Sequence, residues 1–224
     1  MTGEIDIVRH PRARRMRLSV DPASGRARLT LPPRASLKAG MSWAAEQRQW
    51  IAAQQARLPQ PVPFAPGVVI LFRGRPVMID WRADRPRRVA LDGDRLVCGG
   101  PAEGLARRIE NWLRHEALRL LGEETDELAA RIGVAVERVT VGDPRARWGS
   151  CSSRGAIRYS WRLILAPDHV RRATVAHEVG HRVHMDHSRR FHALVAELLG
   201  EDPAPARAWL RANGAALHWF GRAS

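Results

Sequence analysis

The stretch His177-Glu178-Val179-Gly180-His181 decides how the rest of the chain is interpreted. It lies within residues 168–185, whose pattern predicts a helix. Histidines four positions apart lie one above the other on a helix, so both imidazoles can reach one metal ion. Glu178 is turned about 100° from His177, where its carboxylate can reach a water beside the metal. Because zinc lowers the pKa of such a water to roughly 7, the stretch predicts metal-assisted hydrolysis with one zinc ion per chain and Glu178 as general base.

A third metal ligand is expected close downstream, because five of the nine histidines fall within residues 177–192. The candidates are His184, His187 and His192. His184 would lie about 10 Å along the helix from the first histidine, which suits one tetrahedral ion poorly. His187 follows the expected helix end, where a chain that turns back would bring it over the metal. His192 falls in the next expected helix and fits a role in orienting a ligand or stabilising the transition state. We therefore favour His187.

The remaining patterns predict an α+β protein around this helix. Long amphipathic segments predict helices, and short alternating segments between turn residues predict strands. Helices are expected at residues 36–58 (capped by Ser36), 103–131, 188–199 and 204–212, and strands at 16–20, 27–31, within 68–98, at 134–141 and at 156–161, with a loop at 142–150. Four prolines between residues 59 and 66 predict a stiff connector.

These elements predict two domains. Residues 1–100 form an arginine-rich, β-rich N-terminal region with one helix, and residues 101–224 form the domain that carries the metal site.

The charge of the chain is strongly positive, at +14 from 37 Lys and Arg against 23 Asp and Glu. Residues 1–40 hold nine basic and three acidic side chains. An excess of positive charge attracts polyanions, so this region predicts weak, non-specific binding of nucleic acid or of an acidic protein. A solvated surface that keeps the protein soluble explains the charge equally well.

Composition also bears on location. Cys98 and Cys151 do not make a secreted disulfide framework and favour reduced thiols. The N-terminus lacks the apolar stretch of a signal peptide, and no apolar run approaches the ~20 residues that cross a bilayer. We expect a cytoplasmic protein without a membrane segment.

Four stretches of the sequence together resemble a known protein family. They are Arg147-Trp148-Gly149-Ser150-Cys151-Ser152-Ser153, Ser160-Trp161-Arg162-Leu163-Ile164-Leu165-Ala166-Pro167, the stretch from His177 to His181, and His187-Ser188-Arg189-Arg190-Phe191. In these stretches the chain resembles the YgjP-like family of bacterial metal-dependent hydrolases, itself similar to the SprT-like and WLM proteases. The resemblance extends over nearly the whole chain. It implies a zincin-like catalytic domain with an HExxH active-site helix, a peptide or protein substrate, zinc held by His177, His181 and His187, and Glu178 as catalytic base.

The chain departs from the usual family pattern at four positions. Ser160 and Asp186 replace asparagines, and Val179 and Gly180 replace the more usual leucine and alanine. None of these changes removes a ligand or the base. Asp186 can accept a hydrogen bond that orients a neighbouring histidine.

Further residues are candidates for contact with the substrate. Residues 148–151 either border the cleft and bind the substrate backbone as an added strand, or supply core packing by Trp148 and a tight turn at Gly149. Cys151 is either a thiolate near the metal or an inert buried thiol. The candidates for stabilising an oxyanion in the transition state are Tyr159, Arg147, Arg162 and His192.

The function expected from these features is a zinc-dependent metallopeptidase. The alternatives are a nucleic-acid-associated module in which zinc is structural, and a SprT-like protease that is recruited to DNA. Glu178 counts against the structural role, because a structural zinc site needs no carboxylate beside a water and usually contains two or more cysteines.

Overall fold

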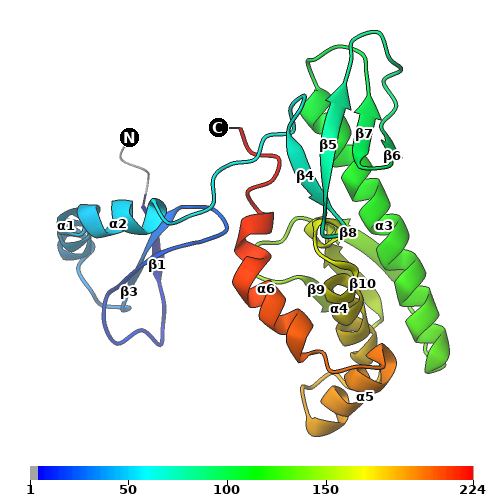
Figure 1. Cartoon of the computed structure of the whole chain (residues 1–224). Coiled ribbons are helices and arrows are strands. Elements are labelled where there is room, and N and C mark those ends of the chain that lie inside the picture. The colour runs from blue at the N-terminus through cyan, green and yellow to red at the C-terminus, as the bar shows by residue number, and fades with distance from the viewer. Residues whose placement is uncertain (1–4, 224) are drawn as a thin grey trace. The chain divides into compact units, whose positions relative to one another are not determined.

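The computed structural model describes residues 5–223 and shows an α+β protein, as expected from the sequence (Figure 1). The chain divides into two compact units, Met1–Gln60 and Pro61–Ser224. The sequence placed a boundary after residue 100 instead. The structure groups the strands before that position with the larger unit, because Ile79 and Leu96 share one hydrophobic core with Ile109 and Leu113 of the following helix.

The smaller unit is a three-stranded sheet with two helices. Strand β3 is central, parallel to β1 and antiparallel to β2. Leu29 and Leu31 point from β3 into a small core that also contains Ala44. The elements are β1 (Asp6–Arg9), β2 (Arg17–Val20), β3 (Ala27–Leu31), α1 (Leu37–Glu46) and α2 (Arg48–Gln55).

The helical part of this unit differs from the single helix that the sequence predicted. Ser36 caps α1 as expected, its side chain accepting a hydrogen bond from the Ala39 N–H at 3.3 Å. The chain then leaves helical geometry at Gln47, with φ −88° and ψ 15°, and resumes as α2. No glycine or proline marks this break in the sequence.

The larger unit begins with a four-stranded sheet of order β4-β5-β7-β6. Its strands are β4 (Val69–Phe72), β5 (Arg75–Trp81), β6 (Ala90–Asp92) and β7 (Arg95–Cys98). The turn between β4 and β5 has positive φ at Arg73 (52°) and Gly74 (75°). Its backbone N–H groups donate to the carbonyl oxygens of Ile164 and Leu165, which ties the hairpin to the chain just before the metal-site helix.

Helix α3 (Leu105–Arg131) crosses the larger unit and buries one apolar stripe, which includes Ile109, Leu113 and Leu121. A second sheet, of order β8-β10-β9, follows it. Strand β9 lies at the sheet edge and begins inside the segment, residues 142–150, that was expected to be a loop. The strands are β8 (Arg138–Gly142), β9 (Gly149–Cys151) and β10 (Ala156–Ser160).

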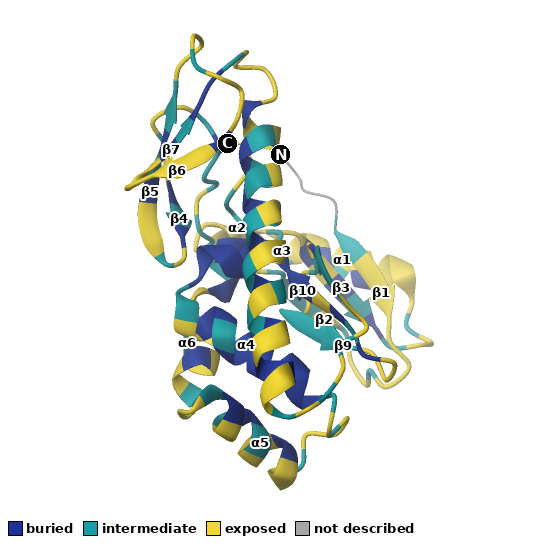
Figure 2. Ribbon diagram, turned by 90° about the vertical axis from the view of Figure 1, so that its right-hand side faces the viewer, coloured by how far each residue is buried: buried dark blue, intermediate teal, exposed yellow. Residues whose placement is uncertain are grey.

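The C-terminal part is helical. After a 3-10 turn, η1 (Trp161–Leu165), the chain forms α4 (Asp168–Gly180), α5 (Arg189–Leu199) and α6 (Ala204–Leu217). Figure 2 shows α4 buried along most of its length. Helices α3, α5 and α6 and strand β9 all contact it. Among the described residues, no helix is long and apolar enough to cross a membrane.

Candidate metal centre

Helix α4 presents His177 and Glu178 in its last turn and ends at Gly180. The sequence predicted a helix that continues to residue 185, and this was wrong. His181 is the C-cap residue, and a tight turn follows, in which the Arg182 N–H donates to the carbonyl of Val179 at 2.9 Å. Because the helix stops here, the segment after it can turn back toward the helix end.

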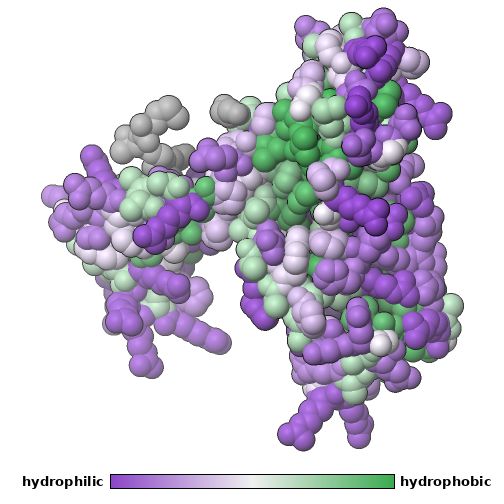
Figure 3. Space-filling model, in the orientation of Figure 1, coloured by the Kyte–Doolittle hydropathy of each residue, from purple (hydrophilic) through white to green (hydrophobic). Residues whose placement is uncertain are grey.

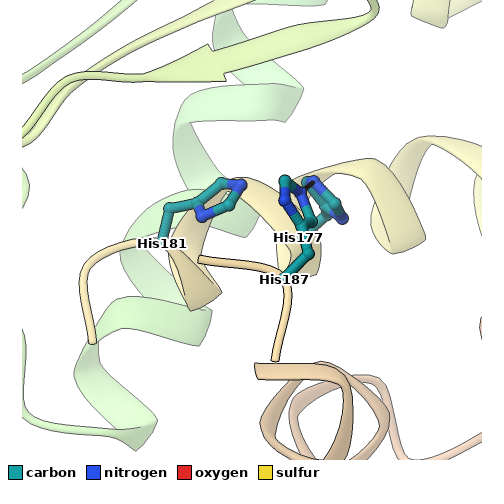
Figure 4. Close-up of side chains that lie close together, drawn as sticks. All are labelled: His177, His181 and His187. Carbon is teal, nitrogen blue, oxygen red and sulfur yellow. Dashed lines mark hydrogen bonds between the residues drawn. The ribbon is translucent and has the colours of Figure 1, made fainter. Parts of the chain in front are cut away.

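The turn brings His187 to the two histidines of the helix. One ring nitrogen from each of His177, His181 and His187 lies within 4.8 Å of the others (Figure 4). The Nε2 atoms of His177 and His187 are 3.3 Å apart. Two nitrogens bound at 2.0–2.1 Å to a tetrahedral zinc ion lie about 3.3 Å apart, so this spacing fits one shared zinc.

Neighbouring groups hold these rings in place. The Nδ1 atom of His181 lies 3.0 Å from the carbonyl oxygen of His184, which leaves Nε2 free to face the other two rings. Ser188 caps α5, its side chain accepting from the Phe191 N–H at 3.4 Å, and so fixes the chain directly after His187. The His184 side chain is not part of the cluster, although its backbone orients one member.

Phe191 forms an aromatic floor beneath the cluster. Its ring stacks on His181 at 4.6 Å between centroids and meets His177 and His187 edge-on, each at 4.9 Å. Phe191 is fully buried. An apolar floor limits the directions in which the imidazoles can rotate and excludes water from one side of the site. Phe191 ends one of the stretches that carry the family resemblance. Its contact with the three rings was not predicted, because an apolar residue in an amphipathic helix predicts only core packing.

The Glu178 carboxylate is buried against strand β9. Its residue is 5% exposed, and it makes no ion pair among residues 5–223. A Cβ placed on Gly149 would collide with the Oε1 atom of Glu178. Gly149 therefore allows the carboxylate to approach the strand. The sequence offered a tight turn as one reason for this glycine, but it lies within β9.

Burial shifts the pKa values of two ionisable groups at this site. Burial raises the pKa of Glu178 to about 7, against the opposing charge of Arg147. Burial, assisted by the charges of His181 and His187, lowers the pKa of His177 to about 4. His177 is therefore neutral at pH 7, as a metal ligand must be.

Two cavities meet at this centre. The metal cleft, of about 350 Å³, is lined by Arg147, Gly149, Ser150, Cys151, His177, Glu178, His181, Met185 and His187. A second cavity of about 260 Å³, here called the apolar pocket, shares four of these residues and extends between the helices; its lining is Arg147, Trp148, Gly149, Val170, Ala173, Thr174, His177, Glu178, Val195, Pro203, Ala206, Arg207 and Leu210.

Of the expected substrate-binding residues, the structure brings Arg147 and Trp148 to these cavities. Arg147 lines both of them. Trp148 lines the apolar pocket and also packs against His218, 5.4 Å between ring centroids, and against Gly214. It thus combines the cleft-lining and packing roles that the sequence left open.

Tyr159 and Arg162 lie elsewhere and line neither cavity. Tyr159 is fully buried, and its hydroxyl oxygen is 3.0 Å from that of Thr125; burial raises the pKa of this tyrosine well above its ordinary value. Arg162 is 9% exposed and pairs with Asp143, while its Nη1 donates to the carbonyl of Leu217 at 2.7 Å. Both side chains therefore make contacts within the interior of the larger unit and do not face either cavity.

The other expected residues lie at the margin. His192 is exposed, with its ring 6.3 Å from that of His187, and lines neither cavity. Asp186 accepts from the Ser188 N–H at 3.3 Å, and the His184 carbonyl takes the ring-orienting position that the sequence allowed for Asp186. Cys151 is a free thiol in the metal cleft whose pKa is raised by burial.

Comparison with known proteins gives one match. A family model described as YgjP-like, metallopeptidase domain, matches residues 14–213. The matched range begins before β2 and ends within α6, so it includes the three histidines and every residue that lines the two cavities. No curated protein and no solved structure matches the chain.

Proposed function

Because the chain belongs to the YgjP-like metallopeptidase family, we propose that it is a zinc metallopeptidase that hydrolyses peptide bonds with Glu178 as general base. The observation that carries this proposal is the convergence of three imidazole nitrogens within 4.8 Å, beside a buried carboxylate in one open cleft. The donor set fits a catalytic zinc site, which takes three protein ligands and keeps a fourth position for the reaction. We propose His177, His181 and His187 as those ligands.

In this proposal the chain supplies the proton transfer. Zinc bound by three imidazoles supplies Lewis-acid activation of water and polarisation of a carbonyl oxygen. Glu178 takes a proton from the attacking water at a carboxylate oxygen and delivers it to the leaving amide nitrogen. Burial raises the pKa of the Glu178 carboxyl, which makes its carboxylate a stronger base than an exposed one.

Strand β9 is the proposed binding edge for the substrate backbone. It pairs with β10 on one side only, and Gly149, Ser150 and Cys151 all line the metal cleft. The free edge of a strand presents backbone N–H and C=O groups that can pair with an extended peptide. A substrate bound in this way would run past Glu178 and the histidines as an added strand.

Arg147 is the proposed stabiliser of negative charge on the carbonyl oxygen. It is the only one of the four candidates, Arg147, Tyr159, Arg162 and His192, that lines the metal cleft. The Arg147 side chain forms no ion pair or hydrogen bond with residues 5–223, so its donors are available to a substrate. Loss of one such donor typically lowers kcat about 10²–10³-fold.

Metal analysis combined with digestion of a peptide library tests this function. We expect one zinc per purified chain, cleavage of a subset of peptides by the parent, and cleavage about 10²–10⁴-fold slower by Glu178→Gln with its zinc retained. Absence of zinc, or equal cleavage by the variant, would overturn the mechanism. If zinc is present but neither protein cleaves any peptide, a zinc-binding module is the better account.

A second candidate activity, nucleic-acid binding, rests on the smaller unit. Arg12, Arg14, Arg15 and Arg17 are exposed around the start of β2, and none of them has an ion-pair partner within residues 5–223. Hydrophilic side chains also project widely from this unit in Figure 3. We propose weak, sequence-independent binding of nucleic acid here, which is compatible with a protease recruited to DNA. The two free cysteines fit the cytoplasmic location that we propose.

Salt dependence tests this second activity. Each phosphate that an arginine neutralises releases counterions, so affinity should fall steeply between 50 mM and 200 mM salt. Replacing Arg12, Arg14 and Arg15 by glutamine should flatten that slope. Binding that ignores salt, or no binding at low ionic strength, would leave the arginines as a solubilising surface.

A further inference from the structure

The apolar pocket opens directly beside the proposed catalytic residues. His177 and Glu178 form one part of its wall. The rest comes mainly from apolar side chains on or next to α4, α5 and α6, namely Val170, Ala173, Val195, Pro203, Ala206 and Leu210. Its volume is about 260 Å³. An apolar cavity of about 150 Å³ accommodates benzene, so this one has room for a large aliphatic or aromatic side chain.

The charge around the pocket is one-sided. Arg207 of α6 and Arg147 line it, and Glu178 is the only acidic residue in the lining of either cavity. Arg207 is exposed, and its side chain forms no ion pair or hydrogen bond within the described part of the chain. By contrast, two buried arginines of this unit are paired, Arg162 with Asp143 and Arg171 with Glu124. Arg207, like Arg147, is therefore a cation beside the apolar pocket with no partner of its own in the described part of the chain.

We infer that the site selects peptides in which an apolar side chain fills this pocket and a carboxylate next to it pairs with Arg207. The inference rests on the proposed function and specifies its substrate class. A guanidinium binds a carboxylate with two parallel, charge-assisted hydrogen bonds, which are stronger than neutral ones. The carboxylate is either the free C-terminus of the peptide or an acidic side chain that follows the apolar residue.

Arg147 and Arg207 contact different parts of the substrate in this inference, because they occupy different positions. Arg147 lines both the metal cleft and the apolar pocket, whereas Arg207 lines only the pocket. Arg147 is thus near the reacting carbonyl, and Arg207 is near the part of the substrate that follows the apolar side chain. A bound dication would make the cleft still more attractive to an anion.

Binding of four matched peptides to zinc-loaded Glu178→Gln tests the inference without turnover. The peptides share one sequence and end in Phe with a free carboxylate, Phe amide, Phe-Asp amide or Phe-Asn amide. Fluorescence anisotropy of labelled peptides gives Kd, and the parent enzyme gives kcat/KM for the same set. We expect the free acid to bind about 10–100-fold more tightly than the amide, or Phe-Asp amide more tightly than Phe-Asn amide by the same factor. The pair that differs identifies the source of the carboxylate.

Two arginine variants on α6 make the test specific. Arg207→Gln in the same background should abolish the preference. Arg211→Gln removes the same charge from an exposed position one turn further along α6, outside both cavities, and should keep the preference. Leu210→Ala, which widens the pocket, should raise affinity for larger apolar residues relative to Val. Thermal unfolding confirms that each variant is folded.

Each outcome of these measurements decides between the alternatives. Peptides that are cleaved and bound equally with and without the carboxylate, with Arg207→Gln unchanged, would overturn the inference and leave the metallopeptidase intact. An equal loss of preference in Arg211→Gln would show a general charge effect and would also overturn it. A protein that neither binds nor cleaves any peptide would overturn both the inference and the proposed function.

Discussion

The two ends of α4 differ in how their ionisable side chains are paired. At its N-terminal end, Asp168, Arg171 and Arg172 each have an oppositely charged partner. At its C-terminal end, His177 and Glu178 have no ion-pair partner among the described residues. The ion pairs join the N-terminal end of α4 to neighbouring elements. The unpaired polar groups at the other end are the ones that we propose as a metal ligand and a proton acceptor.

The difference has an energetic reason. The Arg171 side chain is only 2% exposed, so its charge requires Glu124 and Asp168 within hydrogen-bond distance. Glu178 is buried without such a partner, and the unfavourable burial of its charge appears as a pKa of about 7. Perturbed carboxylates in clefts are typical of active sites. The fold therefore tolerates an energetically unfavourable buried carboxylate, Glu178, at the C-terminal end of α4. Ion pairs of Arg171 stabilise the N-terminal end of the same helix.

The largest expected effect is at the C-terminal end. Glu178→Gln keeps the shape of the side chain but cannot accept the proton, so kcat/KM should fall about 10²–10⁴-fold. The free energy of unfolding should not fall, because no ion pair is lost and the unfavourable burial of a charge is removed. Steady-state kinetics and denaturant unfolding on the same samples measure both. A variant that loses stability along with activity would mean that Glu178 is structural.

Gly149→Ala tests whether the position of the Glu178 carboxylate matters for activity. A methyl group on β9 would collide with the Glu178 carboxylate, so the base must shift. We expect a loss of activity with the zinc content unchanged, because the atoms nearest this Cβ position all belong to Glu178 and none to the three histidines. Full activity in Gly149→Ala would show that the carboxylate does not need its position against the strand.

At the N-terminal end, two adjacent arginines provide a matched pair. Arg171 and Arg172 both pair with glutamates, Glu124 and Glu127 of α3, but the side chain of Arg172 is 31% exposed. Arg171→Met leaves a partly buried glutamate without its partner and should destabilise the fold by about 3–5 kcal/mol. Arg172→Met should cost less than about 1 kcal/mol. Urea unfolding compares them, and equal losses would refute the contrast in burial.

The local part of this picture could be predicted from the sequence. The spacing of His177 and His181 placed both on one helix, and Ser36 and Ser188 signalled the caps that the structure shows. The favoured third histidine, His187, lies in the cluster, because the chain turns back soon after α4 ends. Such features depend on a few neighbouring residues.

The parts that the sequence did not predict depend on contacts between distant residues. Strand β9 is three residues long and exists because β10 pairs with it. The need for glycine at position 149 arises from Glu178, on another element. Arg207 reaches the site only because α6 packs on α4. The early end of α4 was missed because residues 182–185 are compatible with a helix and carry no stop signal.

Histidines near the C-terminal end of α4 should differ in how much they contribute to metal binding. Ligand binding to the native state stabilises it by about 2.7 kcal/mol at 100 times Kd. His187→Ala should lose most of this metal-linked stability and most of the zinc, whereas His184→Ala should lose little, because it keeps the backbone carbonyl near His181. Thermal unfolding with and without a chelator measures the difference. The reverse order would mean that His184 is the third ligand.

The smallest expected effect is the acid sensitivity of the N-terminal end. Hydrogen bonds from Arg73, and then from Arg171, lower the pKa of Asp168 to about 2, against the opposing effect of burial. An aspartate in an unfolded chain has a pKa near 3.9, so the folded state favours the charged form. This contribution is fully present above about pH 4 and is lost as the pH falls through 2. The carboxylate also lies in the first turn of α4, where the helix dipole favours negative charge.

Asp168→Asn tests this contribution directly. The difference in the free energy of unfolding between parent and variant should be constant above pH 4 and shrink toward zero by pH 2. Its size should be less than about 1 kcal/mol, because the side chain is 47% exposed and solvent screens the pair. In 1 M salt, where the Debye length is about 3 Å, the difference should narrow further. A difference in the free energy of unfolding that grows as the pH falls would contradict this prediction. It would mean that the ionised Asp168 carboxylate does not stabilise this end of α4.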